Sequence, residues 1–214
     1  MLIGLVGFIG SGKGTVSDIL QTKKGFHKIS FADSLKDAVA AVFGWPRHLL
    51  EGDTIESRAF RETVDEFWSS KLEKDITPRW VLQNVGTEVF RNGFHDNIWI
   101  YSVERKLQEN RHRNIVVSDV RFPNEIEAIR KNGGHIVRVI RGPDPKWYET
   151  ADNANRYRNP SIMSVEYPDV HVSEWAWIGQ VFDYHLYNDA SVELLESNIN
   201  QVLTAFTGPV KMAV

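Results

Sequence analysis

The sequence predicts an α/β protein whose helices pack on both faces of a central parallel sheet. Short apolar runs that suit buried strands alternate along the chain with stretches of helical periodicity. The clearest example is RNIVVSDVRFPNEIEAIRKNGGHIVRVIR, residues 113–141, which predicts a strand, a helix and a second strand joined by a right-handed crossover. A glycine-rich segment at residues 7–14 directly follows the first apolar run, as expected where a buried strand turns into a helix.

Composition and length narrow the class of protein. The chain has 214 residues, 42% of them hydrophobic and 25% charged, which suits one globular domain with an ordinary core. The net charge of −3 gives no reason to expect nucleic-acid or membrane-surface binding. Cysteine is absent, which excludes disulfides, thiolate zinc sites and a cysteine nucleophile. No run approaches the roughly 18 apolar residues of a membrane span, so we expect a cytoplasmic protein.

The first part of the chain predicts two strands and two helices. The apolar run 2–6 suits a strand buried on both faces, and residues 15–22 have helical spacing. FHKISFAD predicts a second strand that ends at Asp33. The helix expected next, SLKDAVAAVFG at 34–44, has Ser34 as its plausible cap.

The remaining elements continue the same alternation. Residues 77–91 predict a helix with a threonine cap and a proline in its first turn, and residues 96–110 predict a second amphipathic helix. Strands are expected at 115–117 and 135–140. The end of the chain, YHLYNDASVELLESNINQVLTAF, predicts a short strand, a turn and a closing helix.

The segment GFIGSGKGT, residues 7–15, is typical of a phosphate-binding loop. Its glycines let the backbone fold tightly, and its N–H groups with the following helix N-terminus favour an anion. The usual signature G-x-x-x-x-G-K-S/T has a hydroxyl residue where this chain has Gly14. We expect the phosphates of ATP to be bound by Gly10, Ser11, Gly12, Lys13, Gly14 and Thr15.

The GSGKGT run resembles the loop of nucleoside monophosphate kinases of the adenylate-kinase type, in which glycine also follows the lysine. That resemblance implies Mg²⁺ held largely through water and the nucleotide phosphates, and it favours phosphoryl transfer to a small molecule. The predicted fold is therefore a three-layer P-loop NTPase sandwich. We expect one domain over residues 1–214, with a helical acceptor-binding insertion at 45–76 and a lid at 142–176. Its core segments are 1–44, 77–141 and 177–207.

Charged residues at the expected strand ends are candidates for the chemistry, because ligands gather at the carboxyl ends of parallel strands. Asp119 and Arg121 follow the strand at 115–117, and with Lys13 they form the expected catalytic group. Asp33 and Asp119 are candidates to organise Mg²⁺ through water. The alternative is structural: a strand-end salt bridge for Asp119 and Arg121, and a helix cap for Asp33.

Arginines outside the loop suggest phosphate contacts, since forked guanidinium donors match a phosphate monoester. Arg58, Arg61 and Arg79 lie where monophosphate kinases bind their acceptor. Closing arginines also stabilise the charge that spreads over a phosphoryl group in transfer. The lid candidates are Arg141, Arg156 and Arg158. For each single arginine a solvated surface position is the alternative.

Several blocks resemble, in the same order, the deoxynucleoside monophosphate kinases of T4-like bacteriophages. They cover most of the chain, and the two blocks around LQNVGTE and SDVRFPNE are the most specific in combination. The matching blocks are GFIGSGKGT, FADSLKDAV, EGDTIESR, RWVLQNVGTEVFRNGFHDNIWI, VVSDVRFPNEIEAIRKNGGHIVRVIR, HVSE and YNDASVELL.

The resemblance implies transfer of the ATP γ-phosphoryl group, with Mg²⁺, to a deoxynucleoside monophosphate (dNMP). The resulting diphosphate would supply phage DNA synthesis in the host cytoplasm. The chain departs from the family pattern at Gly14, Trp80 and 122–124, so no base preference is carried over. The acceptor-binding residues implied by position are Lys36, Asp37, Arg58, Arg79, Gln83, Trp99 and Arg121.

Two other functions share some of these features. A dephospho-coenzyme A kinase also combines GSGK with acids at strand ends. A nucleotide switch or DNA-linked ATPase would transfer the phosphoryl group to water or not at all, and Gly14 and the lack of a basic stripe count against it. The sequence leaves a homodimer open.

Overall fold

The computed structural model describes residues 1–207, and the chain divides into two compact units. Unit 1 comprises residues 1–29 and the chain from Asn110 onward, and unit 2 comprises Ser30–Glu109. The expected insertion at 45–76 lies inside unit 2, together with flanking helices that we expected in the core. No helix within residues 1–207 is long and apolar enough to cross a membrane.

Unit 1 contains a five-stranded sheet in which all neighbouring strands are parallel. The order β2-β3-β1-β4-β5 places the first strand in the middle, flanked by the two strands of the 113–141 segment. The predicted parallel sheet is confirmed. The strands are β1 (Leu2–Val6), β2 (His27–Ile29), β3 (Ile115–Val117), β4 (His135–Ile140) and β5 (Tyr184–Tyr187).

The prediction that the second strand ends at Asp33 was wrong. Strand β2 ends at Ile29, and Asp33 is the first residue of the next helix. The carboxylate of Asp33 accepts a hydrogen bond from the backbone N–H of Ser30 at 2.8 Å, which turns the chain before a longer strand can form. Ser34 is likewise not the cap, since its hydroxyl pairs with that of Ser102 at 2.7 Å.

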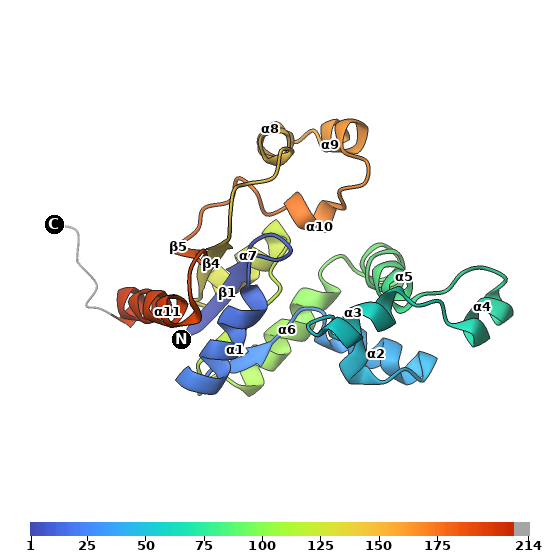
Figure 1. Ribbon diagram of the computed structural model, residues 1–214, viewed down its shortest axis with the longest axis horizontal. Helices are drawn as coiled ribbons and strands as arrows, with labels where there is room; N and C mark the ends of the chain where they lie inside the picture. The colour runs from blue at the N-terminus through green and yellow to red at the C-terminus, as the bar shows by residue number, and fades with distance from the viewer. Residues whose placement is uncertain (208–214) are drawn as a thin grey trace. The chain divides into compact units, whose positions relative to one another are not determined.

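Helices cover both faces of the sheet, which confirms the predicted three layers (Figure 1). Helices α1 (Lys13–Lys24) and α11 (Val192–Thr207) pack on one face, and α7 (Pro123–Lys131) packs on the other. Helix α7 buries Ile126 and Ile129 completely against β1 and β4.

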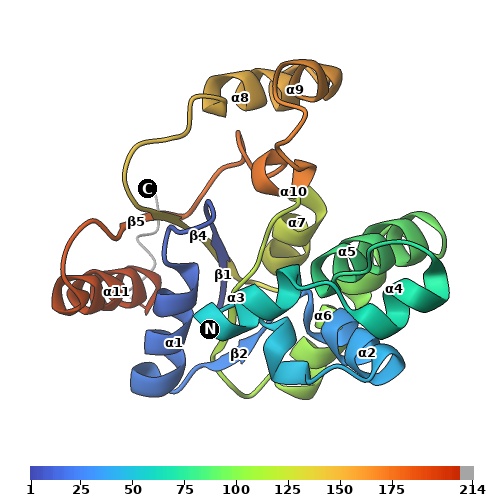
Figure 2. The same ribbon diagram turned by 45° about the vertical axis from the view of Figure 1, so that its right-hand side comes forward.

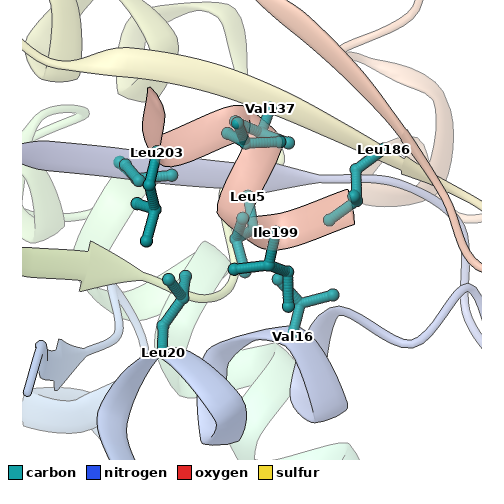
Figure 3. A pocket seen from close by; sticks show the side chains of 9 residues that line it. Leu5, Val16, Leu20, Val137, Leu186, Ile199 and Leu203 are labelled. Carbon is teal, nitrogen blue, oxygen red and sulfur yellow. The ribbon is translucent and has the colours of Figure 1, made fainter. Parts of the chain in front are cut away.

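The layer between the sheet and helices α1 and α11 is a close-packed apolar core (Figure 3). Leu5 and Val137 from the sheet meet Val16 from α1 and Ile199 from α11. The space left between them is only about 10 Å³ and is lined by apolar side chains. A cavity of that size is at the lower limit for one water molecule, so this region holds the fold together and binds no ligand.

The segment expected as a lid also belongs to unit 1, and it contains three short helices that the sequence did not predict. They are α8 (Tyr148–Arg156), α9 (Ser161–Glu166) and α10 (Val172–Trp175). Figure 2 shows this segment beyond the ends of β1 and β4, on the side of the glycine-rich loop. Near its start, Trp147 and Tyr148 contact the ring of Phe8 in the loop, and Trp177, directly after its end, contacts the same ring.

Unit 2 is helical. The predicted cap at Thr77 is confirmed, because its side chain accepts the backbone N–H of Trp80. The helix continues past Asn84 as a π-helix, a rare form that often marks functional segments. The elements are α2 (Asp33–Phe43), η1 (Arg47–Leu50), α3 (Ile55–Glu62), α4 (Glu66–Leu72), α5 (Pro78–Asn84), η2 (Val85–Asn92) and α6 (Ile98–Glu109).

Candidate phosphate-binding and phosphoryl-transfer site

The glycine-rich loop joins β1 to α1 in a conformation that requires glycine at two positions. Gly7 has φ 146°, and a Cβ there would lie 2.4 Å from the carbonyl oxygen of Val139. Gly12 has φ 94°, and a Cβ there would lie 2.1 Å from Nδ2 of Asn188. The loop is therefore pressed against β4 and the turn after β5.

Lys13 is the first residue of α1, and its side chain reaches back over the loop. Its Nζ donates hydrogen bonds to the carbonyl oxygens of Gly7 at 2.6 Å and Phe8 at 2.9 Å. Burial and the positive charge of Arg121 lower the pKa of Lys13 from 10.5 to about 8, while the carboxylates of Glu174 and Asp119 partly raise it. Unit 1 thus brings together Lys13, Asp119 and Arg121, the three residues of the predicted catalytic group.

The lowered pKa of Lys13 predicts a pH dependence of ATP binding. Phosphate favours the protonated amine, so the pKa of Lys13 is higher with ATP bound than in the free protein. Between these two pKa values, binding takes up a proton and weakens as the pH rises. We expect a constant ATP dissociation constant below about pH 7.5, and above about pH 8 a weakening of up to about tenfold per pH unit.

Titration of ATP by calorimetry between pH 7 and pH 9.5 measures this dependence. The rise of the ATP dissociation constant above about pH 8 should disappear in Lys13→Ala, which has no amine at this position. A wild-type dissociation constant that does not change between pH 7.5 and 9.5 would contradict the assignment of Lys13 as the titrating cation.

Arg121 is held in place through both its backbone and its guanidinium group. Its N–H donates to the buried carboxylate of Glu125 at 2.8 Å, as part of the start of α7. Its guanidinium group forms an ion pair with Glu174 at 2.6 Å and a hydrogen bond with the hydroxyl of Ser173 at 3.3 Å. The lid segment therefore contacts the arginine that was predicted to meet phosphate.

The three lid candidates occupy exposed positions in or near this segment. Arg141 directly follows β4. Arg156 pairs with Asp152 within α8 at 2.9 Å, and Arg158 follows that helix with φ 52°. Their contact with a transferring phosphoryl group stays a prediction.

In unit 2, several predicted acceptor-binding residues lie in one network of ion pairs. Lys36 pairs with Glu51 at 2.6 Å, and Asp37 pairs with Arg47 at 2.5 Å. Arg47 also pairs with Glu51, which connects the two pairs. Burial would raise the pKa of Glu51, but hydrogen bonds and charges from Lys36 and Arg47 outweigh it and lower that pKa. Asp33 faces two cations, with Lys106 at 3.5 Å and Arg47 at 3.6 Å.

The other predicted acceptor residues of unit 2 lie on α3, α5 and α6. Arg58 donates to the carbonyl oxygens of Gly52 and Asp53, and Arg79 pairs with Glu62. Gln83 is exposed. Trp99 is only 7% exposed, and its indole N–H donates to the carbonyl oxygen of Gly86 at 2.9 Å. Trp99 thus has a packing role, and its contact with an acceptor stays a prediction.

Comparison with known proteins identifies the family. A family model described as deoxynucleotide monophosphate kinase matches residues 47–153, which is 107 of 214 residues. A protein of Acanthamoeba polyphaga mimivirus that carries the name of a deoxynucleotide monophosphate kinase is 36% identical over 153 residues. That alignment covers 66% of this chain and 74% of the mimivirus protein.

The chain belongs to the deoxynucleotide monophosphate kinase family.

Two further similarities are narrower. The deoxynucleoside-5′-monophosphate kinase of Escherichia phage T5 is 43% identical over 56 residues, covering 26% of this chain and 22% of the phage protein. The dephospho-CoA kinase of Campylobacter jejuni aligns over 97% of this chain and 98% of its own, with 15% identity and a TM-score of 0.43. A structural similarity this weak favours no particular activity.

Three side chains near the loop were not predicted as site residues from the sequence of this family member, namely Arg138, Glu174 and Asn188. Arg138, only 8% exposed, pairs with Asp144 at 2.5 Å, and its guanidinium group lies 5.9 Å from the ring centre of Phe8. The signal that could have found it is a charged residue inside a buried strand. Glu174 lies in the segment expected as a lid, and Asn188 lies in the turn expected before the closing helix.

Asn188 links the last strand to the loop. Its Nδ2 donates to the carbonyl oxygen of Ser11 at 2.9 Å, and its backbone N–H donates to Ile140. Asn188→Ala should raise the KM for ATP about threefold to tenfold with little change in kcat, because a hydrogen bond worth about 1 kcal/mol no longer holds the loop. Steady-state kinetics at varied ATP measures the change.

A matched control is Asn198→Ala. Asn198 also donates from Nδ2 to a backbone carbonyl, that of Tyr187, but this bond joins α11 to β5 and not to the loop. The KM of the Asn198→Ala variant for ATP should stay within about twofold of the wild-type value. Equal effects of the two substitutions would contradict a specific role of Asn188 in the loop.

Proposed function

We propose that this chain transfers the γ-phosphoryl group of ATP to the 5′-phosphate of a deoxynucleoside monophosphate, and that it does so in the cytoplasm. The observation that carries the proposal is the position of Lys13 over a strained glycine loop, beside Arg121, in a member of this kinase family. A buried strand, the loop and a helix N-terminus form the context that a phosphate-binding loop requires.

The ATP phosphates bind to the N–H groups of residues 10–15 and to the amine of Lys13. That amine donates to two carbonyl oxygens, which are weaker acceptors than a phosphate. The buried hydroxyl of Ser11 has no hydrogen-bond partner among residues 1–207. A buried hydroxyl without a hydrogen bond costs free energy. A loop that adjusts around a phosphate therefore gains hydrogen bonds from both the Ser11 hydroxyl and the Lys13 amine.

Transfer needs no covalent intermediate on the protein. An oxygen of the acceptor phosphate attacks the γ-phosphorus in line, and the bond to the β–γ bridging oxygen breaks to release ADP. Negative charge spreads over the equatorial oxygens of the moving group. Lys13 and Arg121 stabilise that charge, and fixed positions of the cations lower the barrier because little reorganisation is needed.

Mg²⁺ fits this site as an ion that arrives bound to ATP. Residues 1–207 contain no cluster of three acidic or histidine side chains that could hold a metal by themselves. Gly14 supplies no hydroxyl ligand, and Asp119 lies close enough to raise the pKa of Lys13. We propose Asp119 as the acid that orders metal-bound water, with Asp33 as a second candidate. When bound, the ion neutralises charge on the β- and γ-phosphates.

For the acceptor we propose contacts from unit 2. Lys36, Arg58 and Arg79 are cationic donors whose present partners are carboxylates or backbone carbonyls. A phosphate dianion can compete with such partners, because it carries two negative charges where a carboxylate carries one and a carbonyl none.

An acceptor panel tests the proposed function. ADP release from ATP and Mg²⁺ is measured with each of the four dNMPs, with dephospho-coenzyme A, with single-stranded DNA and with no acceptor. We expect at least one dNMP to stimulate ADP release and the other additions to leave it at the level without acceptor. Stimulation by DNA or dephospho-coenzyme A but by no dNMP would overturn the proposal.

A further inference from the structure

The ion pair between Arg121 and Glu174 lies next to the loop lysine. The Oε1 of Glu174 is 2.6 Å from the guanidinium group of Arg121, and the two side chains are 18% and 39% exposed respectively. Ser173 adds a hydrogen bond to the same guanidinium nitrogen, and its hydroxyl is in turn paired with Nδ1 of His171. A short stretch of the lid segment therefore supplies an anion and a hydroxyl to one arginine.

The carboxylate of Glu174 and the hydroxyl of Ser173 present hydrogen-bond acceptors to Arg121, as the oxygens of a phosphate would. A carboxylate and a phosphate are both anionic acceptors that match the fork of a guanidinium group. The charges of this group sum to zero, with Lys13 and Arg121 positive and Asp119 and Glu174 negative. A polyphosphate that enters this group meets repulsion from Glu174 and competition for Arg121.

We propose that Glu174 is a positioning residue that occupies Arg121 in place of phosphate and gives it up when nucleotide binds. The proposal rests on the proposed function only in taking ATP as the ligand. Arg121 then has two discrete partners, Glu174 in the free protein and a phosphate oxygen in the complex. The exchange keeps the guanidinium group paired at every stage, which avoids the cost of an isolated charge in a partly buried site. The exchange also limits ATP affinity, because ATP must displace the carboxylate.

Glu174→Gln is the substitution that tests this exchange, since it keeps the shape of the side chain and removes its charge. We expect ATP with Mg²⁺ to bind about threefold to tenfold more tightly at pH 7, as the competing anion is gone. The pH above which ATP binding weakens should also move below the wild-type value, because Glu174 raises the pKa of Lys13. A purely structural role of Glu174 predicts neither change.

The experiment is ATP titration by calorimetry, with a double-mutant cycle. In an Arg121→Gln background, Glu174→Gln should tighten ATP binding clearly less than it does in the wild type, because only the direct repulsion is relieved and the competed group is absent. Glu149→Gln is the matched control, an exposed glutamate on α8 of the same segment, and its dissociation constant should stay within about twofold of the wild-type value. Circular dichroism confirms that each variant is folded.

Folded Glu174→Gln that binds ATP with wild-type affinity or more weakly would overturn the proposal. So would an equal gain in the Arg121→Gln background, because the effect would then not pass through Arg121. These titrations contain no acceptor, so their outcome is independent of whether a dNMP is phosphorylated. Failure of the acceptor panel and failure of the exchange are thus separate results.

Discussion

Lys13→Ala should lower kcat/KM for phosphorylation of a dNMP by about 10³-fold or more. The substitution removes the cation that lies over the loop and that would follow the γ-phosphoryl group into the transition state. The fold should survive, because alanine favours the first turn of α1 and the loop conformation depends on Gly7, Gly12 and Asn188. Initial rates of ADP release with dNMP, together with a thermal melt, measure both expectations.

Lys24→Ala is the control for that substitution. It removes a lysine from the same helix, but from its last turn, where the side chain is half-buried. Activity should stay within about twofold of the wild-type value. If Lys13→Ala retained wild-type activity while folded, the phosphate site would lie elsewhere.

Arg121→Gln should lower kcat about 10²- to 10³-fold, with a rise of less than about tenfold in the KM for ATP. Arg121 stabilises charge that develops during transfer, so its loss acts more on the transition state than on ground-state binding. The carboxamide retains hydrogen-bonding capacity towards Ser173 and Glu174 but carries no charge. Separate determination of kcat and KM at saturating dNMP distinguishes these effects.

Lys131→Gln at the other end of α7 removes a cation without touching the loop, and its kcat should not change measurably. A loss in Arg121→Gln that appeared only as an increased KM for ATP would show that Arg121 serves binding and not transfer.

Much of the fold followed from the sequence because its signals are local. An all-apolar run, a glycine loop and a β-branched strand each depend on residues close together in the chain, and β1, β3 and β4 appear at their predicted bounds. The positions of the loop and of the strand-end pair Asp119 and Arg121 could be predicted for the same reason, since the architecture fixes where strand ends lie. Their roles stay predictions.

The rest depended on contacts between distant residues. The second strand stops early because Asp33 bonds to Ser30 instead of continuing the ladder, and no periodicity signals that choice. The lid helices are only four to nine residues long, too short for a repeating apolar stripe to mark them. Asn188 bonds to Ser11, which lies 177 residues earlier in the chain. Glu174 bonds to Arg121, which lies 53 residues earlier. Their roles are visible only in the folded chain.

Transfer of a labelled phosphoryl group shows whether the Lys13 loop catalyses phosphorylation of a dNMP by ATP. The protein is incubated with Mg²⁺, γ-³²P-labelled ATP and a dNMP, and the nucleotides are separated. We expect label in the β-phosphate of a deoxynucleoside diphosphate, one per ADP formed, in the wild type and in Lys24→Ala but not in Lys13→Ala. Label released only as inorganic phosphate, or labelled diphosphate formed equally by Lys13→Ala, would contradict the proposed function.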